Sequence, residues 1–237
     1  MELISKYAKY YYEKQDEDLI KGLDEAINKE AENIYNFFDP TLERKQVKIH
    51  IIPTKEEYDN ITSKRRNKEV PKWEIGNTGD GIITYVSLKD YKNTDHAYKL
   101  KNYDYALDDY NKTIVHEFVH YVTILYKKKY NIDKNTRYLD EGIAQILSHQ
   151  RDGLKRDFNY SLEDILESKD CYMGFYLMTK YILDNYGKEY FFKLLNDKDY
   201  ATEETPKIYK QIKKGQLIVL FYILIPIFIK SNTFVMN

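Results

Sequence analysis

The chain has 237 residues, a length that suits one medium-sized domain with attachments or two small domains. Its 37 basic and 38 acidic residues leave a formal charge of −1, so the composition gives no sign of the basic surface that nucleic-acid binding requires. The single cysteine excludes an internal disulfide and a zinc site built from several thiolates, and it is consistent with a reducing compartment.

The first 40 residues predict an N-terminal helical extension. Apolar residues recur at spacings of three and four from Leu19 to Phe38, and the tyrosines between residues 7 and 11 are expected to continue this helical face against the main domain. Asp39-Pro40 is expected to end the extension. The segment is too polar for a secretory signal, and we therefore expect a cytoplasmic protein.

A strand and a helix are predicted next. The alternating, β-branched residues 47–52 are typical of a strand. Thr54 and Glu57 have the spacing of a capping box, which predicts that a helix begins there. Residues 60–71 are highly charged and predict a loop.

Residues 73–75 and 82–88 predict a β-hairpin joined by the glycine-rich turn 77–81. Two interpretations of the second strand are open. As an edge strand near a functional site it would bind an extended peptide by strand addition, whereas as an internal strand it would only support the sheet.

The motif with the most specific chemistry is His116-Glu117-x-x-His120, on a helix predicted over about residues 110–128. Positions i and i+4 share one helix face, so both imidazoles can reach one metal ion, with Glu117 beside the open coordination position. The surrounding apolar periodicity predicts a buried helix that holds these side chains still. Because a short motif can also arise by chance, a metal site needs a third ligand.

Glu141 is the candidate for that third ligand. It follows His120 by 21 positions, which is enough chain for the motif helix to end, turn and return antiparallel. Two imidazole nitrogens, one carboxylate and one water make the open geometry of a catalytic zinc site. The alternative is that Glu141 serves only the dipole at the start of its own helix.

At these two segments the chain resembles a known family. His116–His120 followed by Tyr138-Leu-Asp-Glu-Gly-Ile-Ala144 is similar to the gluzincin metallopeptidases, especially the peptidase MA-like family. A looser likeness extends from Val47 to about Asn196. The resemblance implies an α+β, zincin-like (thermolysin-type) catalytic domain with a small twisted sheet, two ligand helices and a mainly helical second half.

The resemblance also implies the chemistry of the site. One Zn²⁺ per chain would be held by His116, His120 and Glu141, and Glu117 would be the general base for a zinc-activated water. The implied activity is hydrolysis of peptide bonds in a peptide or protein substrate. The chain has no Gly-Ala-Met-Glu-Asn-type segment for gripping a free amino terminus, which favours an endopeptidase.

The donor to the tetrahedral oxyanion is less well defined. Aminopeptidase-like relatives place a tyrosine three residues before a glycine on a later helix, but Cys171 holds that position before Gly174. Tyr172, one residue later, is the first candidate, although one residue turns a helix by about 100°. His149 is a second candidate. Cys171 itself is expected to be a small buried thiol and not a nucleophile.

Further helices are predicted in the second half. Ser161–Asp164 caps a short helix, residues 171–185 form a helix that Gly187 ends, and residues 188–195 form the next one. Thr205-Pro206 is expected to begin a separate basic segment.

The composition changes sharply at residues 217–229, which are uncharged and almost wholly apolar. As a helix this segment spans about 20 Å, short of the roughly 30 Å hydrocarbon core of a bilayer. With Lys230 and residues 234–236 it can be extended into a C-terminal membrane anchor whose catalytic domain stays in the cytoplasm. The alternatives are a segment docked on the domain or an addition unrelated to the fold.

The sequence therefore predicts a helical extension (1–40), a peptidase MA-like zincin domain (41–214) and a hydrophobic tail (215–237). The predicted function is that of a zinc metallopeptidase. The alternative function is a catalytically silent zincin-fold protein that binds peptides, tethered to a membrane by its tail. No substrate sequence can be read from the chain.

Overall fold

The computed structural model describes residues 1–91, 94, 106–134, 136–153, 157–167 and 171–232, with the helical backbone alone at 106–107 and 216–232. The chain divides into two compact units. The first consists of residues 1–133 and 144–150, and the second of residues 134–143 and 151–237. Each unit is described by itself.

The first unit is built on a small mixed sheet, so the described chain is α+β. The strand order is β1-β2-β3-β5-β4, with β2, β3 and β5 parallel and with β1 and β4 antiparallel to their neighbours at the two edges. The strands are β1 (Glu2–Ile4), β2 (Ala8–Tyr11), β3 (Val47–Ile52), β4 (Gly76–Gly79) and β5 (Ile82–Val86). The predicted strand at residues 47–52 is confirmed.

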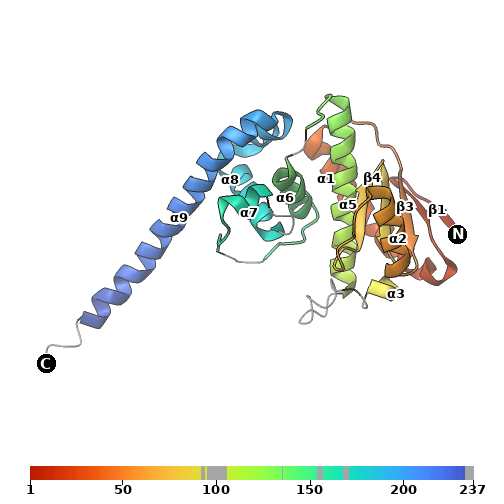
Figure 1. The fold of residues 1–237 in the computed structure, drawn as a ribbon, viewed down its shortest axis with the longest axis horizontal. Coiled ribbons are helices and arrows are strands. Elements are labelled where there is room, and N and C mark those ends of the chain that lie inside the picture. The colour runs from red at the N-terminus through yellow and green to blue at the C-terminus, as the bar shows by residue number, and fades with distance from the viewer. Residues whose placement is uncertain (92–93, 95–105, 135, 154–156, 168–170, 233–237) are drawn as a thin grey trace. The chain divides into compact units, whose positions relative to one another are not determined.

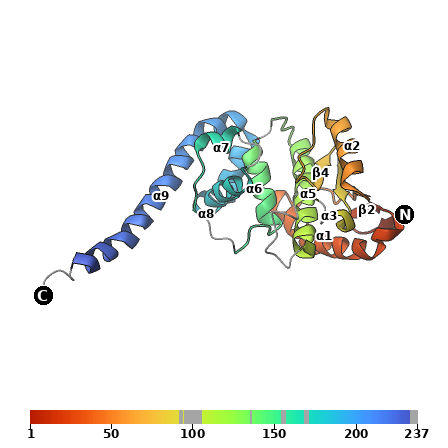
Figure 2. The same ribbon diagram turned by 60° about the horizontal axis from the view of Figure 1, so that its bottom comes forward.

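Helices cover both faces of this sheet. Helices α1 (Glu17–Phe38) and α5 (Ala106–Lys129) lie side by side (Figures 1 and 2). The Tyr85 ring of β5 packs against Tyr110 of α5 at 4.6 Å between centroids, which places α5 on that face of the sheet. Thr84, the residue directly before Tyr85 on β5, faces the opposite way and lies 3.4 Å from Arg65 of α2 (Lys55–Arg66). Because side chains alternate along a strand, β5 packs against α5 with one face and against α2 with the other.

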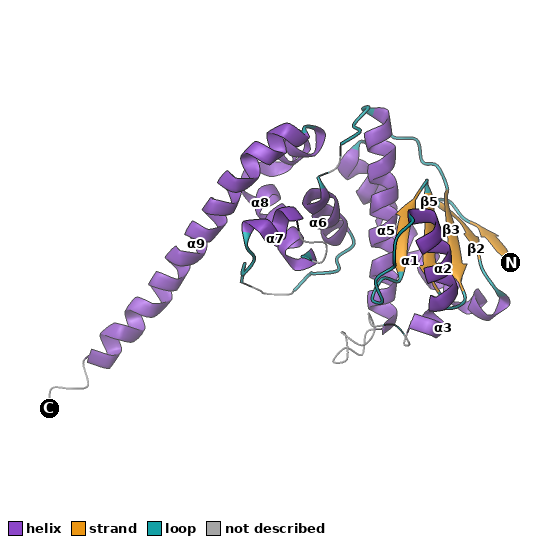
Figure 3. Ribbon diagram, viewed as in Figure 1, coloured by secondary structure: helices purple, strands orange, loops and turns teal. Residues whose placement is uncertain are grey.

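The second unit contains helices and loops only, over the residues that are described (Figure 3). Its helices are α6 (Arg137–Leu147), α7 (Leu162–Glu167), α8 (Tyr172–Asn196) and α9 (Lys198–Asn232). The last residues of α6 belong to the first unit. Gly187 interrupts α8 with φ 81°, at the residue predicted to end this helix.

The prediction of an N-terminal helical extension is wrong for its first part. Residues 2–4 and 8–11 form β1 and β2, so residues 1–40 contribute two strands to the sheet before α1 begins. The tyrosine spacing fitted a helix, but Ala8 and Tyr10 also alternate on one face, and Tyr10 pairs with Ile49 of β3. Pairing with a distant strand decided between two local patterns that the sequence allowed equally.

The predicted loop at residues 60–71 is also partly wrong, because α2 continues to Arg66. Its start is as predicted, since Thr54 accepts a hydrogen bond from the Glu57 amide at 3.2 Å. It ends at Asn67, which adopts the left-handed conformation with φ 49°. The charges that suggested a loop instead belong to the largely exposed side chains of this helix.

The predicted hairpin is present with a shifted first strand. The turn is Asp80-Gly81, both with positive φ, so β4 occupies residues 76–79 and not residues 73–75. Because β5 pairs with both β3 and β4, it is internal to the sheet, and β4 is the edge strand on this side. A two-residue Asp-Gly turn sets this register, whereas the sequence had suggested a five-residue connection.

At the C-terminal end, α9 begins at Lys198 and runs through Thr205-Pro206, so the predicted restart there is wrong. None of the helices whose residues are described is both long and apolar enough to cross a membrane. The side chains of residues 217–229 lie outside the described part of the chain. Their predicted roles, as an anchor or as a docked segment, stay predictions.

Asp39 connects the end of α1 to the end of α5. Its carboxylate accepts hydrogen bonds from Lys129 at 2.6 Å, from Tyr130 at 2.7 Å and from the amide and hydroxyl of Thr41. Burial raises the pKa of this carboxyl, but these donors together outweigh burial and hold its pKa well below the usual range.

We therefore expect Asp39→Asn to lower the free energy of unfolding by about 1–3 kcal/mol at pH 7. The contribution of a carboxyl with a depressed pKa is present above its unfolded pKa of roughly 3.9 and is lost as the pH falls toward the folded value. The difference between wild type and variant should thus stay constant from pH 7 to about pH 4 and shrink as the pH falls further, in urea unfolding curves. A difference that does not depend on pH would contradict this account.

Candidate metal centre

Helix α5 holds the His116–His120 motif in place through its apolar face. Phe118, Val119 and Val122 are fully buried, and the Phe118 ring meets that of Tyr35 on α1 edge to face at 6.0 Å. His116 and Glu117 are each only 7% exposed. The prediction of a buried motif helix is confirmed.

The two imidazoles converge on one point. Their Nε2 atoms are 3.0 Å apart, and the rings are nearly perpendicular with centroids 4.7 Å apart. Two nitrogens that ligate one tetrahedral zinc ion at 2.0–2.1 Å would be roughly 3.3 Å apart. The pair therefore needs to separate by only a few tenths of an ångström to share an ion.

Glu141 lies in the second turn of α6, three residues before the part of this helix that belongs to the first unit. Among the described residues, His116, His120 and Glu141 form the one group of three potential metal ligands. Two imidazoles and one carboxylate are a donor set that suits zinc better than calcium or magnesium, which take mostly oxygen ligands. These residues could hold such an ion.

The carboxylate of Glu117 is held from the edge strand. The Thr78 hydroxyl lies 2.7 Å from Glu117 Oε2 and 2.9 Å from the Glu117 backbone oxygen. Gly76, two residues earlier on the same face of β4, makes this approach possible. A Cβ atom there would lie 2.5 Å from the Tyr85 ring and 3.2 Å from Glu117 Cγ. Sequence reasoning missed Thr78, because residues 77–79 had been interpreted as a turn.

A polar network supports the other face of β4. Asn77 donates to the Tyr58 hydroxyl at 2.6 Å and to Thr62 at 3.2 Å, both on α2. Tyr58 in turn donates to Glu74, which also binds Arg66 at 2.9 Å. Burial first, and the charge of Glu74 second, raise the pKa of Tyr58 far above its ordinary value, so it remains a donor at neutral pH.

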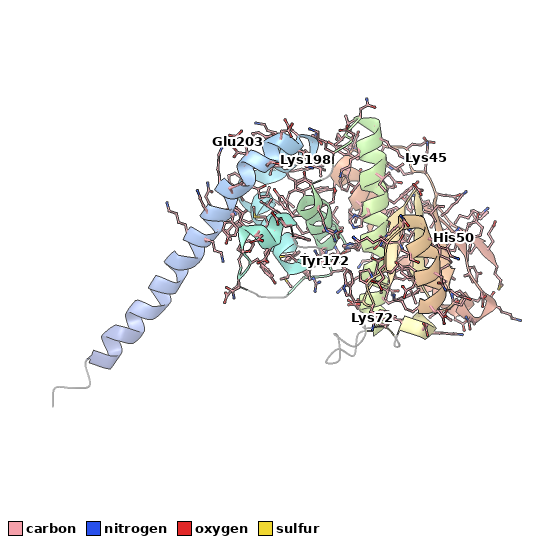
Figure 4. All side chains as sticks on the ribbon, viewed as in Figure 1. Lys45, His50, Lys72, Tyr172, Lys198 and Glu203 are labelled. Atoms are coloured by element: carbon pink, nitrogen blue, oxygen red, sulfur yellow. The ribbon has the colours of Figure 1, made fainter. Side chains whose placement is uncertain are left out.

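Within the second unit, the side chain of Arg137 lies near Glu141. Arg137, one turn earlier on α6, places Nη2 4.0 Å from Glu141 Oε1 and 3.5 Å from the Tyr172 hydroxyl. Tyr172, labelled in Figure 4, is the first residue of α8. A separation of 3.5 Å is at the outer limit of a hydrogen bond. Arg137 was not among the residues that the sequence singled out, and the proposed role of Tyr172 stays a prediction.

The glycine after Glu141 has a packing explanation. A Cβ atom on Gly142 would lie 2.1 Å from Thr179 Oγ1 and 2.6 Å from the Phe175 carbonyl oxygen, both on α8. The Thr179 hydroxyl donates to the Tyr138 carbonyl of α6 at 3.1 Å. Helices α6 and α8 therefore approach each other closely at this glycine, and the turn that carries Glu141 is held against α8.

His149 and Cys171, which the sequence analysis also considered, have contacts of other kinds. His149 has φ 59° at the end of α6 and places Nε2 3.6 Å from Glu30. Cys171 is buried, and burial raises the pKa of its thiol to about 11, as expected for an unreactive cysteine. Of the two histidines that carry no predicted role, His50 is half-buried on β3 beside Tyr11, and His96 lies outside the described residues.

No family model, curated protein or solved structure matches this chain.

We expect Gly76→Ala to lower the free energy of unfolding by about 1–3 kcal/mol, because the added methyl group must displace either β4 or the buried Tyr85 ring. Gly79→Ala is the matched control on the same strand. Its Cβ would meet only the end of the Arg65 side chain, at 3.4 Å, and its effect should stay within about 0.5 kcal/mol. Urea unfolding measures both, and equal losses would contradict the close approach at Gly76.

Proposed function

We propose that this protein is a zinc-dependent metallopeptidase of the peptidase MA-like gluzincin family. The observation that carries the proposal is the arrangement around Glu117. This glutamate is buried on the helix turn between two imidazoles that converge, and the Thr78 hydroxyl of β4 holds its carboxylate. A protein that only stores zinc or uses it for stability has no need of Glu117. Burying a carboxylate at this position costs free energy, which a catalytic role would explain.

In the proposed reaction, His116, His120 and Glu141 would hold the ion. When bound, zinc would lower the pKa of a water and polarise the scissile carbonyl. Glu117 accepts a proton from the attacking water as the oxygen–carbon bond forms, and it delivers that proton to the leaving amine as the carbon–nitrogen bond breaks. Tyr172 is retained as the candidate donor to the oxyanion.

The proposal extends to a zincin-like fold and to endopeptidase activity. A mixed sheet with its edge strand packed on the motif helix, and a helical second unit that carries Glu141, are consistent with this fold. Because β4 is an edge strand and β5 is internal, an extended peptide would add to β4.

The second candidate is a zincin-fold protein that binds peptides without cleaving them. This candidate is favoured by the position of Tyr172, which is one residue away from the position expected of the oxyanion donor. The hydroxyl of Tyr172 lies 3.5 Å from Arg137 Nη2. Cleavage by the wild-type chain separates the two candidates.

The test is zinc content together with cleavage of a peptide library, for wild type, Glu117→Gln and the exposed control Glu56→Gln. We expect about one zinc per chain in all three. Loss of a general base should lower kcat by roughly 10²–10⁴-fold in Glu117→Gln alone. Full activity in Glu117→Gln would exclude its role as the base.

Two other results would change the assignment. Zinc in all three proteins with cleavage in none would favour the peptide-binding alternative. Absence of zinc from every protein would remove His116, His120 and Glu141 as a metal site.

We propose a cytoplasmic catalytic domain, and the role of residues 217–229 is tested separately. The full chain and a chain that ends at Gly215 are mixed with anionic lipid vesicles and floated on a density gradient. If the segment is an anchor, only the full chain should float, because burying its apolar side chains in the bilayer stabilises the bound state by about 0.8 kcal/mol per CH₂ group. A docked segment predicts that neither protein floats.

A further inference from the structure

The Thr78 hydroxyl has one proton and lies close to two acceptors. Glu117 Oε2 is 2.7 Å away and the backbone oxygen of the same residue is 2.9 Å away. A hydrogen bond to an ionised acceptor is shorter and stronger than one to a neutral carbonyl. The shorter contact and the charge both select the carboxylate as the acceptor.

This hydroxyl is also the one hydrogen-bond partner of the Glu117 carboxylate among the described residues. Oε2 is thereby occupied, while Oε1 accepts no hydrogen bond from any described residue. A carboxylate restrained at one oxygen keeps its orientation and presents the other oxygen. The two oxygens of Glu117 are therefore not equivalent.

We propose that Thr78 is a positioning residue, which holds Oε2 of Glu117 so that Oε1 is the oxygen that accepts the proton from water. This inference rests on the proposed peptidase function. Thr78 does not touch the reacting atoms and acts only through Glu117.

The structure holds Thr78 rigidly enough for this role. Threonine is β-branched and restricted at χ1, so its hydroxyl has few directions available. The neighbouring Asn77 anchors β4 to α2 through Tyr58 and Thr62, and Gly76 lets the strand approach Glu117 Cγ. Strand alternation then points Thr78 toward α5 and Asn77 toward α2.

The first experiment compares Thr78→Val with Thr78→Ser. Valine keeps the shape of threonine and removes the donor, while serine keeps the donor. Loss of an outer hydrogen-bond partner in a metal site costs about 10–100-fold in activity. We expect this loss in kcat for Thr78→Val, with KM within about twofold of wild type, one zinc retained and most of the activity present in Thr78→Ser.

Thr84→Val is the matched control. Thr84 is a buried threonine on the adjacent strand whose hydroxyl faces Arg65 on the other side of the sheet. Its substitution should leave kcat unchanged. The proposal is overturned if Thr78→Val retains kcat within about threefold of wild type, or if Thr78→Ser and Thr78→Val are equally impaired.

A second experiment does not depend on activity. Thr78→Val and Glu117→Met are combined in a double-mutant cycle on the metal-free protein, since methionine keeps the length of glutamate without its acceptor oxygens. Thr78→Val should lower the urea midpoint in the wild-type background and leave it nearly unchanged in the Glu117→Met background. Equal shifts in both backgrounds would overturn the contact itself.

The two experiments separate the two proposals. Cleavage by wild type with no effect of Thr78→Val, and no coupling in the cycle, removes the role of Thr78 and leaves the peptidase. Coupling in the cycle for a chain that cleaves no peptide and binds no zinc removes the peptidase, and the catalytic role of Thr78 with it.

Discussion

The close approach of β4 to α5 is the constraint on which the candidate site depends. Gly76 leaves no side chain between the strand and Glu117, and the Tyr85 ring fills the space that a Cβ atom would need. Thr78 then reaches the Glu117 carboxylate. The proposed role of Glu117 as a general base requires a fixed orientation of its carboxylate. The element that fixes this orientation is the edge strand β4 and not the helix that carries Glu117.

The rest of the first unit limits the movement of these two elements. The buried face of α5 packs on α1, and Asp39 holds the ends of these helices together through Lys129 and Tyr130. On the opposite side of the sheet, the network from Arg66 through Glu74 and Tyr58 to Asn77 holds β4 to α2. Burying the polar groups of this network costs free energy unless they are hydrogen-bonded to one another. The network therefore also favours the one position of β4 in which these hydrogen bonds form.

Local patterns predicted the elements whose signal is strong. The helical period around His116–His120, the alternation at residues 47–52 and the capping box at Thr54 each correspond to the observed structure. The short strands were missed or displaced. Residues 8–11 fit a helix as well as a strand, and residues 76–79 contain two glycines, which are typical of a turn. In both cases pairing with a distant strand, which leaves no local signal, decided the conformation.

The sequence by itself determined that two imidazoles meet at the candidate site, because the spacing of His116 and His120 places both on one helix face wherever that helix lies. It also determined that Glu141 is separated from them by enough chain to return. Only the tertiary structure decided that Thr78 holds Glu117, that Gly76 and Gly142 are positions without room for a side chain, and that β4 is the edge strand. These features arise between elements far apart in the chain, and their distances depend on packing that no local pattern encodes.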